Sequence, residues 1–107
     1  MTRQLVLRPE AEEEIAETAS FYESQSDAAH QRFGRLLNGV FDTLLASPRI
    51  YAKRFEDVRR VNVSGFPYAL WFEIVSGTDA VTGQTVELVV LLHLFHQRRN
   101  ITARNFG

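Results

Sequence analysis

The longest apolar run of the chain, residues 86–95, predicts a strand that is buried on both faces. It contains one charged residue and otherwise consists almost entirely of valine, leucine and phenylalanine. The β-branched valines, and the polar, glycine-containing segment before the run, favour a strand over a short buried helix. The run ends abruptly in His96, Gln97, Arg98 and Arg99. We therefore expect a histidine and two arginines at the end of a central strand, where binding and catalytic residues are common.

The N-terminal part of the chain predicts a short strand followed by a helix. Residues 3–8 alternate so that Leu5 and Leu7 share one face of a strand. Pro9 suits the first position of a helix, because its fixed φ and missing N–H cost nothing there. We expect the helix to run over residues 9–24, with glutamates in its first turns, where the helix dipole favours negative charge.

The next segment gives the clearest helical pattern in the sequence. Ser26 or Asp27 can cap its start, and Ser47-Pro48 ends it, because the residue before a proline disfavours helical backbone. Two helices joined by so short a loop predict an antiparallel hairpin. The apolar positions recur with a helical spacing over three turns: Phe33, Leu36, Leu37, Val40, Phe41, Leu44 and Leu45.

The second half of the chain predicts three strands in succession. Residues 58–63 and 68–75 alternate as strands, and residues 76–85 form a polar loop that leads into the run at 86–95. The element order is therefore β-α-α-β-β-β. This order predicts a single α+β domain over residues 1–107, in which an N-terminal strand and an antiparallel helix hairpin pack with a small twisted antiparallel sheet.

The face of the sheet that points away from the helices is also expected to be apolar. With simple alternation along each strand, this face carries Trp71, Val89, Leu91 and Phe95. Such a face needs a cover. A partner protein is one candidate and the C-terminal tail is another, since Ile101 and Phe106 could fix that tail to the sheet.

Composition excludes several classes of protein and site. The hydrophobic share of 45% and the charged share of 23% are ordinary for a soluble globular protein. No apolar run approaches the roughly 20 residues that span a bilayer, and we see no secretory signal, so we expect a cytoplasmic protein. The chain has no cysteine, and its histidines and acids show no metal-ligand spacing. We therefore expect no metal and no cofactor.

Charge is segregated along the chain. Residues 9–27 carry seven acids and no lysine or arginine, whereas residues 49–60 carry five basic residues and two acids. Residues 98–107 carry three arginines and no acid. This distribution indicates a basic surface that faces a polyanion or an acidic partner, unless these are ordinary solvated faces.

The basic residues, together with His96, suggest metal-independent RNA cleavage as one chemistry to test. Cleavage needs a proton acceptor, a proton donor and positive charge beside the phosphate. His96 can serve as acid or base near neutral pH, although it could equally cap the end of the sheet by hydrogen bonding. His93 lies inside the apolar run, where we expect a structural role. The phosphate would be neutralised by basic residues: Lys53, Arg59, Arg60, Arg98 and Arg99.

The arrangement of these motifs resembles the RelE/ParE toxins of toxin–antitoxin systems. The residues that carry the resemblance are Arg8-Pro9-Glu10-Ala11, Ser47-Pro48, Val58-Arg59-Arg60, Phe66 to Phe72 (FPYALWF) and His96-Gln97-Arg98-Arg99, in this order. Together they extend over nearly the whole chain. The resemblance implies a small toxin that a cognate antitoxin neutralises in a hetero-oligomer.

The family divides by target, which leaves three hypotheses. ParE-like members poison DNA gyrase, which would make Arg59, Arg60, His96, Arg98 and Arg99 target-binding residues. RelE-like members cleave mRNA on the ribosome, which would make His96, Arg98, Lys53 and Arg59 catalytic. The Phe-Pro-Tyr and His-Gln-Arg-Arg blocks look more like the ParE and plasmid-stabilisation side, and Phe106 lacks the hydroxyl of a catalytic tyrosine. A non-toxic module that binds only an antitoxin-like protein is the third hypothesis.

Overall fold

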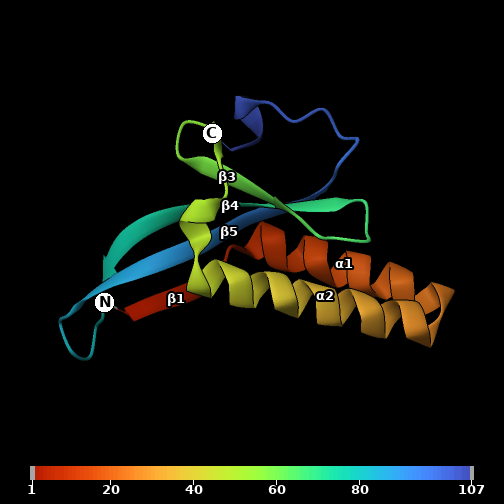
Figure 1. Cartoon of the computed structure of the whole chain (residues 1–107), viewed down its shortest axis with the longest axis horizontal. Helices are drawn as coiled ribbons and strands as arrows, with labels where there is room; N and C mark the ends of the chain where they lie inside the picture. Colours follow the sequence, from red (N-terminus) through yellow and green to blue (C-terminus); the bar gives the residue numbers. More distant parts are fainter. Residues whose placement is uncertain (1, 107) are drawn as a thin grey trace.

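A computed structural model describes residues 2–106, in which two long helices lie side by side across one face of a twisted five-stranded sheet (Figure 1). None of these helices is long and apolar enough to cross a membrane. Two short 3-10 turns, η1 and η2, complete the described elements. In chain order these are β1 (Thr2–Leu7), α1 (Pro9–Gln25), α2 (Asp27–Ala46), η1 (Pro48–Ile50), β2 (Lys53–Phe55), β3 (Val58–Asn62), β4 (Tyr68–Thr78), β5 (Thr85–His96) and η2 (Ala103–Asn105).

The helix hairpin forms as its sequence predicts. Pro9 opens α1, and Ser26 separates the two helices in extended backbone. The Ser26 hydroxyl accepts a hydrogen bond of 3.0 Å from the backbone N–H of Ala29, which caps the start of α2. Ser47 and Pro48 end α2 at the expected position. Local capping residues therefore set the limits of both helices.

The predicted α+β fold class is confirmed, with one difference in the sheet. The strand order is β1-β5-β4-β3-β2, so β5 has a partner on each edge. It pairs antiparallel with β4 but parallel with β1, which makes the sheet mixed rather than wholly antiparallel. The parallel pair is possible because the helix hairpin returns the chain over the sheet between these strands. The short strand β2, which the sequence pattern did not reveal, adds the fifth strand.

A bulge in β5 changes the faces that the sequence predicts. Trp71 pairs with His93 and Phe72 pairs with Leu91, so Leu92 is an extra residue in β5. An extra residue reverses the alternation of side chains beyond it. Val89 and Leu91 therefore pack under the helices, and the prediction that they lie on the opposite face is wrong. Trp71 and Phe95 do lie on that opposite face, as predicted.

The main core lies between the helix hairpin and the sheet. Its largest fully buried side chains come from α2 and from the strands beneath it, and burying each such side chain stabilises the fold by roughly 1.5–3 kcal/mol. The set includes Phe33, Leu44, Leu70, Phe72 and Leu91.

The C-terminal tail covers the face of the sheet that points away from the helices. The sequence had left two candidates for this cover, the tail and a partner protein. Trp71, Leu92 and Phe95 form a second buried cluster there, and Ile101 and Phe106 of the tail pack against it. The Phe106 ring centroid lies 5.2 Å from that of Trp71. In Figure 1 the tail (blue) loops back from the end of β5 towards β3. Residues of this same chain therefore shield the apolar cluster on this face from water.

Glu87, the charged residue in the apolar run, fastens the end of the helix hairpin to the sheet. Its carboxylate accepts hydrogen bonds of 2.9 and 2.6 Å from the Arg49 guanidinium and one of 2.8 Å from Arg3 Nε. Arg3 also donates to the last carbonyl groups of α2, at Leu45 and Ala46. The hydrogen bonds from Arg49 and then Arg3 lower the pKa of Glu87 to about 2. The carboxylate therefore stays charged although it is almost fully buried.

Replacing this carboxylate should make stability depend less on pH. We expect Glu87→Gln to lower the free energy of unfolding by about 2 kcal/mol at pH 7, because charged hydrogen bonds are lost. The folded pKa lies below the ordinary value of 4.5, so the native contribution is present above pH 4.5 and declines as the pH falls towards 2. Urea unfolding should show a smaller difference in the free energy of unfolding between wild type and variant at pH 3 than at pH 7. Glu23→Gln, at an exposed position, is the control. If the difference in the free energy of unfolding between wild type and Glu87→Gln is equal at both pH values, this account is contradicted.

Removing the aromatic ring of the tail should open the second cluster. We expect Phe106→Ala to shift the emission of Trp71, the only tryptophan of the chain, to longer wavelength as water reaches the indole. The stability loss should be about 1–2 kcal/mol, less than for a fully buried phenylalanine. Phe21→Ala, which removes a half-exposed ring from α1, should leave the emission unchanged. Unchanged emission in Phe106→Ala would mean that the tail does not shield Trp71.

Candidate target-binding surface

The end of β5 forms a short turn that carries His96, Arg98 and Arg99, here named the C-terminal basic turn (residues 96–99). Ring atom Nδ1 of His96 accepts a hydrogen bond of 3.0 Å from the backbone N–H of Arg98. The His96 carbonyl accepts another of 3.0 Å from the N–H of Arg99. The N–H of Gln97 donates to the Pro67 carbonyl at 2.8 Å. His96 therefore caps the end of the strand, and the backbone of the turn is fixed.

The two arginines of this turn are both exposed but are held differently. The Arg99 guanidinium lies 4.1 Å from the centroid of the Phe95 ring, a cation–π contact that orients it over the tail side of the sheet. Arg98 points away from the core with its side chain in solvent. His96 lies edge-on to Tyr68, with ring centroids 5.4 Å apart. The turn thus presents two positive charges from a fixed backbone.

A second basic group lies on β2 and β3. Lys53 and Arg59 are cross-strand neighbours. The Lys53 ammonium pairs with Asp57 at 3.1 Å, and Arg59 donates to the Tyr51 carbonyl at 2.7 Å. Together with Arg49, these two residues line a small hollow of about 180 Å³. Both side chains are therefore engaged in local structure at the edge of the sheet.

Arg60 lies on the other face of β3. Its guanidinium is 5.5 Å from the Trp71 ring centroid, and its Nε donates to the Asn62 side chain at 3.1 Å. Neighbouring residues of a strand point to opposite faces, so Arg59 and Arg60 cannot act on the same side of the sheet. The predicted target-binding residues thus fall on more than one surface.

The structure does not bring the predicted catalytic residues together. His96 pairs with Tyr68, whereas Arg59 pairs with Phe72 further along β4. A shift of four residues along the strand and two strands across corresponds to about 13 Å and about 10 Å respectively. Lys53 lies one strand further away, on β2. His96 and Arg98 form one group, and Lys53 with Arg59 forms another.

The sequence did not reveal the role of Glu14 beside β5. One carboxylate oxygen, Oε1, lies 3.0 Å from His93 Nδ1 and accepts a hydrogen bond of 3.1 Å from the backbone N–H of Leu94. The residues are 79 and 80 positions apart, so no local spacing could signal these contacts. The pairing of β1 with β5 ends at Leu91, and beyond that point Glu14 of α1 supplies the hydrogen-bond acceptor for the edge of β5.

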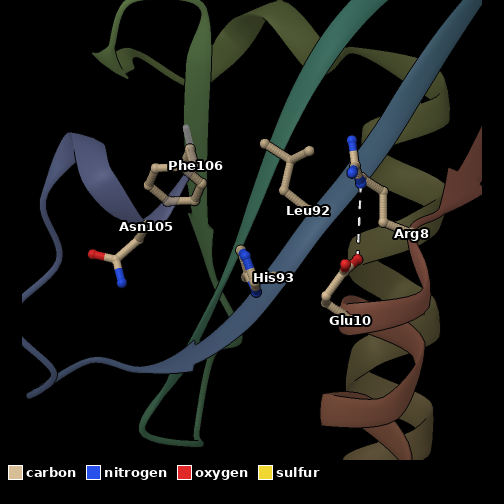
Figure 2. A pocket seen from close by; sticks show the side chains of 6 residues that line it. All are labelled: Arg8, Glu10, Leu92, His93, Asn105 and Phe106. Carbon is tan, nitrogen blue, oxygen red and sulfur yellow. Dashed lines mark ion pairs between the residues drawn. The ribbon is translucent and has the colours of Figure 1, made fainter.

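His93 borders a hollow of about 530 Å³ (Figure 2). The hollow lies between the start of α1, β5 and the tail, and its other lining residues are Arg8, Glu10, Leu92, Asn105 and Phe106. The His93 ring stacks on Phe95 with centroids 4.4 Å apart. Held by Glu14 and Phe95, His93 has the contacts expected of a structural histidine. No cluster of three or more potential metal ligands occurs within residues 2–106.

A helix hairpin on one face of this sheet, with a basic turn after its longest strand, is the arrangement expected from the resemblance to the RelE/ParE toxins. The family comparison agrees and is more specific. Residues 5–101 match the family described as ParE toxin of type II toxin-antitoxin system, parDE. The chain therefore belongs to the ParE toxin family. No curated protein matches the sequence at a significant level.

The contacts of Glu14 lead to a prediction about the free edge of β5. Glu14→Ala should speed hydrogen exchange of the Leu94 amide and lower the free energy of unfolding by about 1–2 kcal/mol, because that N–H loses its partner. Amide exchange followed by NMR measures the first effect and urea unfolding the second. Glu12→Ala, at an exposed position two residues earlier in α1, is the control. If Leu94 exchanges at the wild-type rate in the variant, Glu14 does not protect the edge.

Proposed function

We propose that this chain is the toxin of a parDE-type pair and that it inhibits DNA gyrase by protein–protein contact through the C-terminal basic turn. The observation that carries the proposal is the exposed arginine pair on a fixed turn in a member of the ParE toxin family. A preorganised cationic surface binds an acidic partner with little loss of conformational entropy. Arg60, which lies on the tail side of the sheet, is proposed to extend this surface and His96 to support it. Arg59 lies on the other face of β3 and would contact the target separately.

A ribosome-dependent ribonuclease is the alternative, and the geometry favours it less. Metal-independent cleavage needs an acid or base and phosphate-binding cations around one phosphate. His96 and the Lys53–Arg59 pair stand apart on the sheet, and Nδ1 of His96 already accepts a backbone hydrogen bond. A catalytic role for His96, Arg98, Lys53 and Arg59 acting together would require them to converge in a complex.

We further propose that a cognate antitoxin binds and neutralises this toxin in a hetero-oligomer. Membership of a family defined by type II toxin–antitoxin systems supports such a partner. A small gene adjoining this one is expected to encode it. The tail already covers the second apolar cluster, so the antitoxin need not bind on that part of the sheet.

The double variant Arg98→Ala with Arg99→Ala tests the target surface. We expect it to lose growth inhibition and to need at least about tenfold more protein to inhibit gyrase supercoiling in vitro, a loss of about 1.4 kcal/mol or more in binding. The fold should persist, since an exposed cation–π contact contributes only about 0.5–1 kcal/mol.

Arg104→Ala, which removes an exposed arginine from the same tail, is the matched control and should remain toxic. Circular dichroism and thermal unfolding must show that each variant is folded. A folded double variant with full toxicity would contradict the assignment of the C-terminal basic turn. Wild-type protein that does not affect growth, but still binds its antitoxin, would support the non-toxic binding module.

A further inference from the structure

The C-terminal tail, here residues 100–106, is held on the sheet by the apolar and aromatic contacts of two side chains. Ile101 and Phe106 pack against the second buried cluster, which consists of Val58, Trp71, Leu92 and Phe95. The hydrogen bonds that the tail forms within residues 2–106 all join one tail residue to another. For example, the Thr102 N–H donates to the Asn105 side chain at 2.9 Å. Side-chain packing therefore fixes the tail, whereas backbone hydrogen bonds fix the strands beneath it.

The packing of the tail on the sheet is also incomplete. The Phe106 side chain lines two separate hollows. The hollow of about 530 Å³ extends from this ring past His93 towards the start of α1 (Figure 2), and the other, of about 250 Å³, extends towards β2 and β3. Protein interiors leave few voids larger than a water molecule, so the tail does not fill this face as the helices fill the other.

The closed position of the tail leaves a buried hydrogen-bond donor without a partner. Trp71 is only 3% exposed, and its indole N–H has no acceptor among residues 2–106. The Phe55 and Phe106 rings beside it offer no acceptor, and neither does the Arg60 guanidinium over its ring. Buried tryptophan N–H groups usually have a partner, and a donor without one costs free energy. The closed tail is thus held by few contacts and carries this cost.

The cluster beneath the tail has the composition of a protein-binding surface. Two of its members are aromatic, and each has an arginine beside its ring. The Arg60 guanidinium lies 5.5 Å from the Trp71 ring centroid, and that of Arg99 lies 4.1 Å from the Phe95 centroid. Tryptophan and arginine are enriched among the residues that dominate the energy of protein–protein interfaces. The cluster is also continuous with the C-terminal basic turn, which follows Phe95 directly.

The charges around the cluster differ between its two ends. Arg60 and Arg99 lie on the side of the C-terminal basic turn, whereas the smaller hollow, further along β4, is lined by acids. These acids are Glu56, Asp57 and Glu73. A partner that covers the whole cluster is therefore oriented, with its acidic groups towards the turn.

We propose that the tail is a displaceable cover and that the second cluster is the apolar centre of the surface that contacts gyrase. When the tail moves aside, the partner places an apolar side chain against Trp71 and a hydrogen-bond acceptor at its indole N–H. Acidic groups of the partner lie beside Arg60 and Arg99. This inference rests on the proposed function, since it takes gyrase as the occupant because the cluster adjoins the C-terminal basic turn.

A covered site binds more weakly in proportion to the fraction of molecules in which it is open. The tail therefore inhibits the toxin that carries it, and loosening the tail strengthens binding while it destabilises the fold. A purely structural tail gives the opposite result, because a destabilised binding surface does not bind its target more tightly.

Two tail variants test this expectation, with inhibition of gyrase supercoiling as the measurement. Ile101→Ala and Phe106→Ala should each lower the thermal stability and yet lower, by about three- to tenfold, the toxin concentration that gives half-inhibition. Phe21→Ala, which removes a half-exposed ring from α1, is the control and should leave that concentration unchanged. Trp71→Phe keeps an aromatic ring but removes the indole N–H, so it should raise the concentration for half-inhibition by at least about threefold. Circular dichroism shows whether each variant is folded.

The single tryptophan of the chain allows the cover to be followed in the unmutated toxin as well. Fluorine NMR of toxin in which Trp71 is replaced by a fluorinated tryptophan reports on this ring alone, even when unlabelled gyrase is present. We expect the resonance to shift when gyrase binds, because the tail leaves the indole and the partner takes its place. The double variant Arg98→Ala with Arg99→Ala, which should not bind gyrase, is the control and should show no shift.

The outcomes separate this inference from the proposed function. If wild type inhibits gyrase but both folded tail variants inhibit no better than wild type does, the inference is overturned and the proposed function stands. An unchanged Trp71 resonance in the gyrase complex overturns it in the same way, and this measurement decides the matter if the tail variants do not fold. If wild-type protein does not inhibit gyrase at all, the proposed function fails and the inference fails with it.

Discussion

The structure depends on one constraint, which is that β5 must be covered on both faces and on both edges. The helix hairpin covers one face and the C-terminal tail covers the other. β1 and β4 pair with the two edges of β5. Beyond the end of β1, the carboxylate of Glu14 in α1 accepts the hydrogen bond of the Leu94 N–H. Even the charge within the strand, Glu87, is neutralised by Arg3 and Arg49, and Arg3 also donates to the carbonyl groups at the end of α2. β1, β4 and α1 are placed by their contacts with β5, and β3 and α2 pack in turn on those elements.

Local patterns predicted the elements well, and long-range geometry explains what they missed. The limits of α2 follow from Ser26 and Pro48, residues that act within a few positions of themselves. The bulge at Leu92 has no sequence signature in an apolar run of this kind, because every residue there is suited to either face. Val89 and Leu91 were consequently placed on the wrong face.

The candidate site shows the same division between local and long-range information. The abrupt change from apolar to basic residues after Phe95 correctly located His96, Arg98 and Arg99 at a strand end. It did not reveal that Lys53 and Arg59 lie elsewhere on the sheet, since their positions depend on strand order.

The central functional claim is that the chain acts by contact with gyrase and not by cutting RNA. Pulse labelling after induction without antitoxin tests it most directly, with DNA synthesis and protein synthesis followed separately. The account predicts that DNA synthesis stops first, because gyrase inhibition blocks replication. If protein synthesis stops first, the account is contradicted, and a complex in which His96 and the distant cations meet around RNA must be sought.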